Sequence, residues 1–158
     1  MDYELRAPLP EDAAALAELH VHCWKETYAK QLPEDYFTEE HLVSRRQLWE
    51  RLTQDEDRNL RRVVAEGSKG FLGFALAGGK PGDELQLFSL YVVSANHGTG
   101  LGQQLFNAVL GQQPASLWVA QNNPRATAFY RRNGFEFDGA QKVDPKTPGL
   151  TELRMFRT

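Results

Sequence analysis

Apolar and polar positions recur along the chain with a helical period in some stretches and alternate in others. Within residues 10–28, apolar and small side chains recur every three or four residues, which places them on one face of a helix. Thr38 can cap a second helix, and Asn123 can cap a later one that begins with Pro124. Helices are therefore predicted over residues 10–28, 39–52, 101–110 and 124–133.

Apolar or alternating runs between breaks that contain Gly or Pro predict seven strands. They cover residues 3–8, 60–67, 70–79, 85–93, 116–120, 134–143 and 150–158. The order β-α-α-β-β-β-α-β-α-β-β is typical of an α/β (α+β) fold in which helices cover the faces of a sheet. The crossover from strand 85–93 through a helix to strand 116–120 predicts that these two strands pair in parallel.

Length, composition and charge narrow the class of protein. A chain of 158 residues with 41% apolar and 25% charged residues is typical of a globular protein, so residues 1–158 are predicted to form a single domain. The net charge of −3 opposes nucleic-acid binding, and no apolar run approaches the roughly 20 residues that span a bilayer. Because the start of the chain lacks signal-peptide features and Cys23 is a lone cysteine, we expect a cytoplasmic protein without an intramolecular disulfide.

Three glycines at alternate positions precede the third predicted helix, in the run NHGTGLGQQL of residues 96–105. A helix N-terminus presents unpaired N–H groups and glycines let an anion approach them, so this glycine loop predicts a phosphate or pyrophosphate site. A tight turn without a ligand is the alternative. The run lacks the lysine of a P-loop and fails the G-x-G-x-x-G spacing, which disfavours nucleotide hydrolysis and hydride transfer.

A second run, NNPRATAFYRRNGFEF at residues 122–137, follows the next strand. It resembles the N-x-R-A-x-x-x-Y-x-x-x-G-F motif of the GCN5-related N-acetyltransferase (GNAT) superfamily, and HGTGLG at 97–102 resembles that family's [RQ]-x-x-G-x-[GA] motif. His97 replaces the usual Arg or Gln, and Ser94 replaces a proline. The resemblance covers nearly the whole chain. It implies a GNAT fold, with a mixed sheet of about six to seven strands splayed between the fourth and fifth and about four helices on its faces.

The resemblance implies acetyl-CoA as the cosubstrate. Its pyrophosphate would contact backbone N–H groups of the glycine loop, and its pantetheine arm would pair with the first of the two splayed strands like an added strand. The N–H of Val92 would stabilise the oxyanion, and Asn123 would contact the arm as well as cap its helix. The residues implied in acetyl-CoA binding are Leu90, Tyr91, Val92, His97, Gly98, Thr99, Gly100, Leu101, Gly102, Gln103, Asn123 and Tyr130.

Direct attack of an amine on the thioester needs an acid and a base. The resemblance implies that Tyr130 protonates the leaving thiolate, and the alternative is a core tyrosine. Gln86 stands where many family members have a glutamate base, so Glu84, two residues earlier, is a fallback candidate. His20 and His22 are further candidates, and a water chain is another option.

The acceptor pocket of this fold lies beside the first helix and the fourth strand. The candidates for substrate binding are His20, Trp24, Tyr28 and Phe88. The resemblance predicts an N-acetyltransferase that moves an acetyl group to a primary amine of a small molecule or peptide in a ternary complex. A non-catalytic acyl-CoA-binding or sensing domain is the alternative, because no base is evident. No metal, nucleic acid or membrane partner is expected, and the resemblance allows a homodimer.

Overall fold

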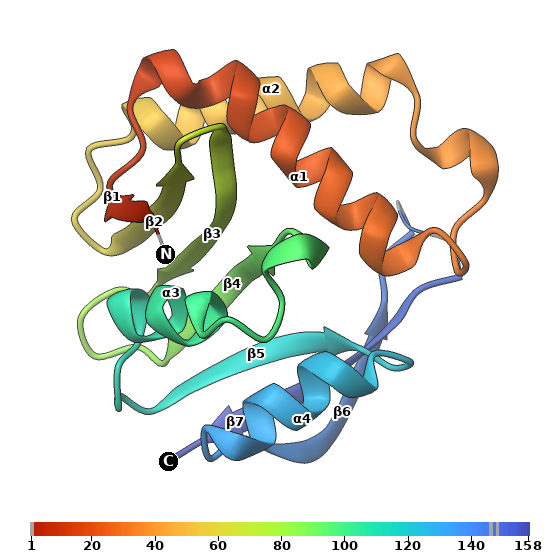
Figure 1. Cartoon of the computed structure of the whole chain (residues 1–158). Helices are drawn as coiled ribbons and strands as arrows, with labels where there is room; N and C mark the ends of the chain where they lie inside the picture. Colours follow the sequence, from red (N-terminus) through yellow and green to blue (C-terminus); the bar gives the residue numbers. More distant parts are fainter. Residues whose placement is uncertain (1, 146, 148) are drawn as a thin grey trace.

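The computed structural model of the protein describes residues 2–145, 147 and 149–158. Seven strands form one mixed sheet in the order β1-β2-β3-β4-β5-β7-β6 (Figure 1). The strands are β1 (Tyr3–Arg6), β2 (Leu60–Gly67), β3 (Gly70–Gly78), β4 (Leu85–Val92), β5 (Ala115–Ala120), β6 (Glu136–Val143) and β7 (Thr151–Arg157). The helices are α1 (Ala13–Tyr28), α2 (Glu39–Gln54), α3 (Leu101–Val109) and α4 (Pro124–Arg132). The predicted order of elements and the predicted α/β (α+β) class, a mixed sheet with helices on its faces, are confirmed.

The observed element bounds lie within a few residues of the predicted ones. The clearest difference is at the first helix, because Pro10–Asp12 form a 3-10 turn, η1, and α1 begins only at Ala13. The N–H of Leu9 donates to the Asp12 carboxylate at 2.7 Å, and the N–H of Asp12 donates to the Leu9 carbonyl at 2.9 Å. These two bonds close a tight turn that precedes the helix.

Helices cover both faces of the sheet. α1 and α2 pack on one face through a cluster that includes Leu16, Trp49 and Phe74. α3 and α4 pack on the other face through a cluster that includes Phe106 and Tyr130. Figure 1 shows the two helix pairs well apart, with strands of the sheet between them. A ligand that enters between the strands can therefore meet side chains from both helix layers.

The parallel pair β4–β5 is joined along less than half of β4, as the splay in the expected fold requires. The register pairs Leu85 with Ala115 and Leu87 with Leu117. Past these positions the two strands, both fully described, diverge and do not pair with each other. A register shift against β3 leaves Phe88 as an extra residue in β4, just where the strands part. The rest of β4 has one edge free of a neighbouring strand.

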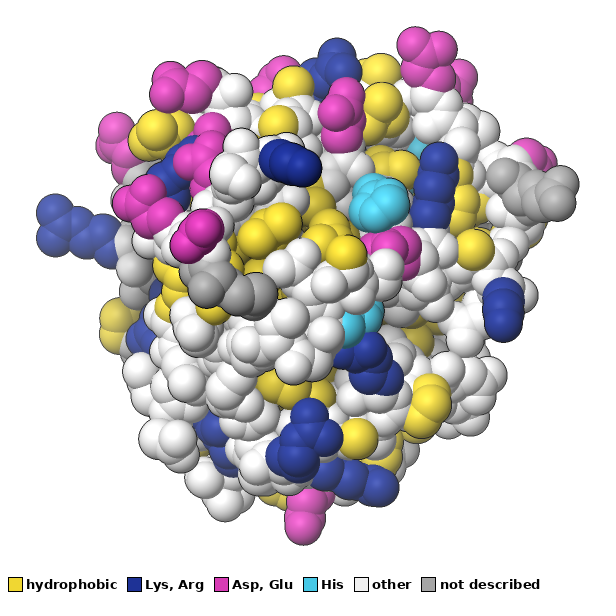
Figure 2. All heavy atoms as spheres, viewed as in Figure 1, with side chains coloured by type: hydrophobic (Ala, Val, Ile, Leu, Met, Phe, Trp, Pro, Cys, Tyr) yellow, Lys and Arg dark blue, Asp and Glu magenta, His cyan; other side chains and the backbone are white. Residues whose placement is uncertain are grey.

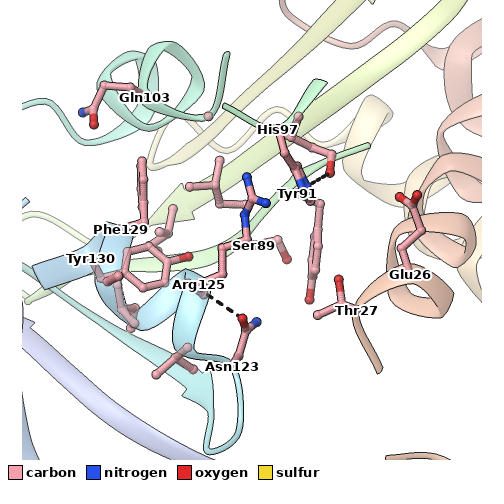
Figure 3. Close-up of a pocket in the computed structure, with 18 of the residues that line it drawn as sticks. Glu26, Thr27, Ser89, Tyr91, His97, Gln103, Asn123, Arg125, Phe129 and Tyr130 are labelled. Carbon is pink, nitrogen blue, oxygen red and sulfur yellow. Dashed lines mark hydrogen bonds between the residues drawn. The ribbon is translucent and has the colours of Figure 1, made fainter. Parts of the chain in front are cut away.

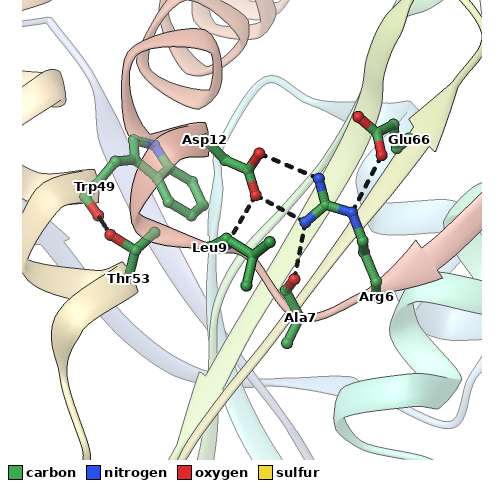
Figure 4. A network of polar contacts seen from close by, with 7 residues as sticks. All are labelled: Arg6, Ala7, Leu9, Asp12, Trp49, Thr53 and Glu66. Carbon is green, nitrogen blue, oxygen red and sulfur yellow. Dashed lines mark hydrogen bonds and ion pairs between the residues drawn. The ribbon is translucent and has the colours of Figure 1, made fainter.

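A polar network fixes the start of α1 against the edge of the sheet (Figure 4). The Arg6 guanidinium in β1 donates to both carboxylate oxygens of Asp12, at 2.7 and 3.1 Å, and to Glu66 of β2 at 3.2 Å. The hydrogen bonds from Arg6 lower the pKa of Asp12, against the effect of burial. Because α1 is held at this end, its other end has a defined position beside β4.

Within the described residues, every helix falls short of the length and hydropathy that a bilayer crossing requires.

Candidate functional site

A cleft of about 810 Å³ opens where β4 and β5 part, and the end of α1, the glycine loop and α4 complete its walls. Figure 3 shows Phe129 and Tyr130 of α4 on one side, Glu26 and Thr27 of α1 on the other, and Tyr91 of β4 between them. Residues far apart in the sequence therefore meet at one place, because the sheet separates there.

The glycine loop forms one end of the cleft. Gly98 and Gly100 have φ angles of 78° and 89°, in the left-handed region that side chains other than glycine rarely adopt. A Cβ added at either position would meet no described heavy atom within 4 Å, so the space beside this backbone is open. The first turn of α3 has N–H groups without helical acceptors, since the bond from Gln104 to the Gly100 carbonyl is an early one in the helix. The loop therefore offers N–H groups to an anion.

The predicted loop residues separate into two sets. His97, Gly98, Gly100, Gly102 and Gln103 line the cleft. Two others contribute to the loop's own structure. The hydroxyl of Thr99 donates to the Asn96 carbonyl at 2.6 Å, and the side chain of Leu101 is fully buried in the core.

His97 and Gln103 use their side chains within the protein. The Nε2 atom of His97 lies 2.8 Å from the Val92 carbonyl, on the free edge of β4 (Figure 3). The amide of Gln103 exchanges hydrogen bonds with that of Asn133, at 2.9 and 3.1 Å. This exchange ties the first turn of α3 to the end of α4.

The free edge of β4 forms the floor of the cleft. Leu90, Tyr91 and Val92 all line it, as predicted for backbone that meets the pantetheine arm. The N–H of Val93 donates to Leu72 of β3 at 2.9 Å, and N–H groups alternate along a strand, so the N–H of Val92 points toward the cleft. Asn123 lines the cleft and caps α4, because its side chain accepts from the N–H of Ala126 at 3.2 Å.

Three tyrosines converge on the cleft from different elements. Tyr28 of α1 and Tyr91 of β4 place their hydroxyl oxygens 3.4 Å apart. Burial raises the pKa of Tyr130 of α4, and Tyr28 raises it further, so these two hydroxyls are near each other. Burial also raises the pKa of Tyr28 and of Tyr91. All three phenols therefore hold their protons at neutral pH and can donate hydrogen bonds.

The structure does not place the fallback base, Glu84, in this cleft. Glu84 is exposed and precedes β4 at the end where β4 and β5 are paired, whereas the residues of β4 that line the cleft begin at Leu87. It was chosen because it stands two residues from Gln86 in the sequence. Its position gives no support to Glu84 as the base.

The predicted roles of His20 and Trp24 in substrate binding are also not supported by their positions. His20 is 4% exposed, and its Nδ1 accepts from the indole N–H of Trp49 at 3.2 Å. Burial, together with the charges of Arg45 and His41, lowers the pKa of His20 to about 3. Trp24 stacks on Tyr36 and is not among the residues that line the cleft. Of the predicted acceptor residues, Tyr28 and Phe88 line the cleft.

Two residues that the sequence analysis did not assign to the site occupy its walls. The Glu26 carboxylate accepts from both the backbone N–H and the hydroxyl of Ser94, and His22 lies 3.4 Å from it. Ser94 stands where a proline is usual, and a proline could donate neither bond. Arg125 points from the first turn of α4 into the middle of the cleft (Figure 3). The serine at position 94, in place of the usual proline, is the sequence feature that could have pointed to Glu26 as a site residue.

Charge is unevenly distributed on the face that carries the cleft. Figure 2 shows acidic side chains mainly over the half with α1 and α2, whereas Lys and Arg side chains lie over both halves, so those over the half with α3 and α4 have few acidic neighbours. Arg125 and Arg132 bring two of these cations to the wall of the cleft. An anionic ligand therefore meets complementary charge on the α4 side.

Comparisons with known proteins agree with this geometry. Residues 58–137 match the family model described as an acetyltransferase (GNAT) domain. The chain is 28% identical, over 91% of its length and 92% of the relative's, to the uncharacterized N-acetyltransferase YuaI of Bacillus subtilis (strain 168). The PaiA N-acetyltransferase of Thermoplasma acidophilum, solved in complex with coenzyme A, has a similar fold, with a TM-score of 0.77, 21% identity and coverage of 100% and 99% of the two chains. The ribosomal-protein-alanine N-acetyltransferase of Brucella melitensis gives a TM-score of 0.71 at 23% identity, covering 98% of each chain.

Proposed function

Because the chain belongs to the acetyltransferase (GNAT) family, we propose that it is an acetyl-CoA-dependent N-acetyltransferase that moves an acetyl group to a primary amine. One observation carries the proposal. The free edge of β4 and the N–H groups of the glycine loop line the same cleft, so one ligand with an amide-containing arm and a pyrophosphate can contact both.

The residues present fit acetyl-CoA by their chemistry. Gly98 and Gly100 leave open space beside backbone N–H groups, which suits the pyrophosphate. The β4 edge from Leu90 to Val92 suits the amides of the pantetheine arm, as an added strand would. Arg125 and Arg132 supply positive charge for the phosphates. Acetyl-CoA, when bound, supplies the activated acyl group.

The side chains around the gap in the sheet support direct attack in a ternary complex. Tyr130 reaches the gap from the α4 side with its proton retained, so it can protonate the leaving thiolate. The N–H of Val92 points into the gap and can stabilise the oxyanion. Tyr28 and Phe88 stand where an amine approaches from the other side.

The experiment measures binding and turnover separately. We expect acetyl-CoA to raise the Tm of the protein and a panel of primary amines to release free CoA thiol in its presence. Triethylamine, which has no N–H to lose, serves as the control and should release none above hydrolysis. Binding without turnover on any primary amine would favour the alternative of an acyl-CoA-binding or sensing domain. Failure of millimolar acetyl-CoA to shift the Tm would refute both.

A further inference from the structure

The proposed reaction needs a group that takes a proton from the incoming amine, and the nearest carboxylate is poorly suited to it. Glu26 is the only acidic residue among the described residues that line the cleft. Burial would raise its pKa, but hydrogen bonds from Ser94 and the nearby histidines hold the pKa of Glu26 below its usual value. Both of its oxygens accept from Ser94. Glu26 therefore ties α1 to the end of β4 and is a weak base.

A second carboxylate, that of Glu152, lies on the strand next to β5, outside the residues that line the cleft. Glu152 is on β7, directly opposite Ala120 at the open end of β5 and opposite Lys142 of β6. It is partly buried. Its position at the open end of the sheet brings it near the end of α1, although the two are more than a hundred residues apart in sequence.

Tyr28 links Glu152 to the cleft. The Tyr28 side chain is 8% exposed and packs in one cluster with Ala120, the strand partner of Glu152, and with Leu150, two residues before Glu152. Cross-strand partners share one face of a sheet, so the Glu152 side chain lies on the same face as that of Ala120, against which Tyr28 packs. Burial raises the pKa of Tyr28, and the negative charge of Glu152 raises it as well. On its other side the Tyr28 hydroxyl lies 3.4 Å from that of Tyr91, at the gap in the sheet.

We propose that Glu152 is the proton acceptor of the reaction and that it acts through the hydroxyl of Tyr28. This inference rests on the proposed function. The ammonium form of the amine gives a proton to the Tyr28 oxygen while the Tyr28 proton passes to the Glu152 carboxylate. The neutral nitrogen then forms the C–N bond to the acyl carbon and the C–S bond breaks. Tyr130 gives its proton to the thiolate sulfur and regains one from the nitrogen, and Glu152 releases its own proton to solvent.

The electrostatics at Glu152 suit this role. Burial raises the pKa of Glu152, the charge of Lys142 lowers it, and the charge of Asp144 raises it, with a net upward shift. A base is most effective when its pKa approaches the working pH, so an upward shift brings a glutamate closer to that condition. Glu26 and Glu152 are thus driven in opposite directions, which is the pattern expected when one carboxylate stays ionised and another exchanges protons.

The decisive experiment compares Glu152→Gln and Tyr28→Phe in pH profiles of kcat/KM with two amines. Benzylamine is protonated at neutral pH, whereas aniline is already neutral there. We expect each variant to lower kcat/KM for benzylamine by about 10²-fold at neutral pH and to move the acidic limb of its profile up to the pKa of the amine, because only the free amine then reacts. Aniline should be affected little, because it needs no initial deprotonation. The double variant should lose no more than either single one, since both act in one path.

The matched control is Glu136→Gln, an exposed acid on the neighbouring strand β6, which should keep the wild-type profile. An acidic limb that stays at its wild-type position in Glu152→Gln, or equal losses for the two amines, would overturn the inference. If wild-type protein releases no CoA with any primary amine of the panel, the proposed function fails; release with the same pH profile in wild type and Glu152→Gln overturns this inference alone. If Glu152→Gln misfolds, Tyr28→Phe decides alone by the position of the limb.

Thermal stability gives a readout that does not depend on turnover. The raised pKa of Glu152 means that the folded protein binds its proton more tightly than the unfolded chain does, so this group costs stability once the pH exceeds its unfolded pKa. Glu152→Gln should therefore raise the Tm at neutral pH and change it less in acid. An unchanged Tm at neutral pH would contradict the partly desolvated carboxylate on which the inference depends.

Discussion

Single side chains in this protein owe their chemistry to what surrounds them. Tyr130 is 9% exposed, lies against Phe129 and Phe135, and holds its proton because burial disfavours the phenolate. Burial raises the pKa of Tyr28 and Tyr91 too, yet their side chains lie on the α1 side of the sheet. A tyrosine can therefore donate a proton to the thiolate on the α4 side of the gap, and another tyrosine can relay a proton on the α1 side.

Tyr130→Phe should lower kcat by about 10²-fold while the affinity for acetyl-CoA changes little. The reason is that the substitution removes a hydroxyl and leaves the ring that packs against Phe129 and Phe135. Steady-state kinetics together with calorimetric titration of acetyl-CoA would test it. Equal losses in kcat and affinity would indicate a packing role and contradict the acid role.

At the scale of elements, the site depends on how two helices are held against the splayed strands. The glycine loop directs the N-terminus of α3 into the cleft, and the Gln103–Asn133 amide pair joins α3 to α4. Arg157 of β7 holds the C-terminal ends of both helices, because its guanidinium donates to the carbonyls of Gly111, Gln113 and Asn133. The relative position of phosphate site and Tyr130 follows from these contacts.

Gly100→Val should abolish measurable acetyl-CoA binding while the protein remains folded. Its φ of 89° is costly for a β-branched residue, by about 1–3 kcal/mol, and the new side chain would fill the open space beside the N–H groups. Gly139→Val is a matched control, since Gly139 has a φ of 92° and equally open surroundings on β6. Both variants should lose similar stability, and a similar loss of binding in both would refute the anion site.

Arg157→Met should lower the free energy of unfolding by about 3 kcal/mol, because it leaves partly buried carbonyls at the ends of α3 and α4 without a donor. Urea denaturation would measure the change. Arg154→Met on the same strand removes an ion pair to Asp138 whose arginine side chain is 43% exposed, and we expect a much smaller loss. Equal losses would contradict the role assigned to the carbonyl bonds of Arg157.

At the scale of the whole molecule, the cleft is where two helix layers and two halves of the sheet meet, so its width depends on contacts far from it. The Arg6–Asp12 pair anchors α1 at the opposite end from Glu26 and Tyr28. Because its pKa is lowered in the folded state, Asp12 contributes stability above its unfolded pKa, and this contribution is lost as the pH falls through the folded pKa.

Asp12→Asn should reduce the free energy of unfolding by about 2 kcal/mol at neutral pH, since it removes the charged partner of Arg6. The difference from wild type should shrink as the pH falls below about 4, where the wild-type carboxylate is itself protonated in the unfolded chain. Chemical denaturation at several pH values would test this. Glu66→Gln, the more exposed partner of Arg6, is the control and should have a small effect. A difference that is constant with pH would contradict the prediction.

The local sequence pattern was sufficient to predict most of the architecture and the glycine loop. Hydrophobic periodicity, helix caps and glycines are signals that depend only on a few neighbouring residues. The order of strands and helices could therefore be predicted from the sequence. The glycine loop was equally readable, because its backbone angles depend on Gly98 and Gly100 themselves.

The acceptor side required the folded chain. Glu84 was chosen by its nearness to Gln86 in sequence, yet it lies at the paired end of β4, whereas the register of β7 on β5 places Glu152 opposite Ala120 at the other end of the parallel pair. His20 has the sequence features of a base and is buried against Trp49. Which titratable groups meet, and with what pKa, is decided by strand register, by where the sheet splays and by burial, and none of these follows from the residues adjacent in the chain.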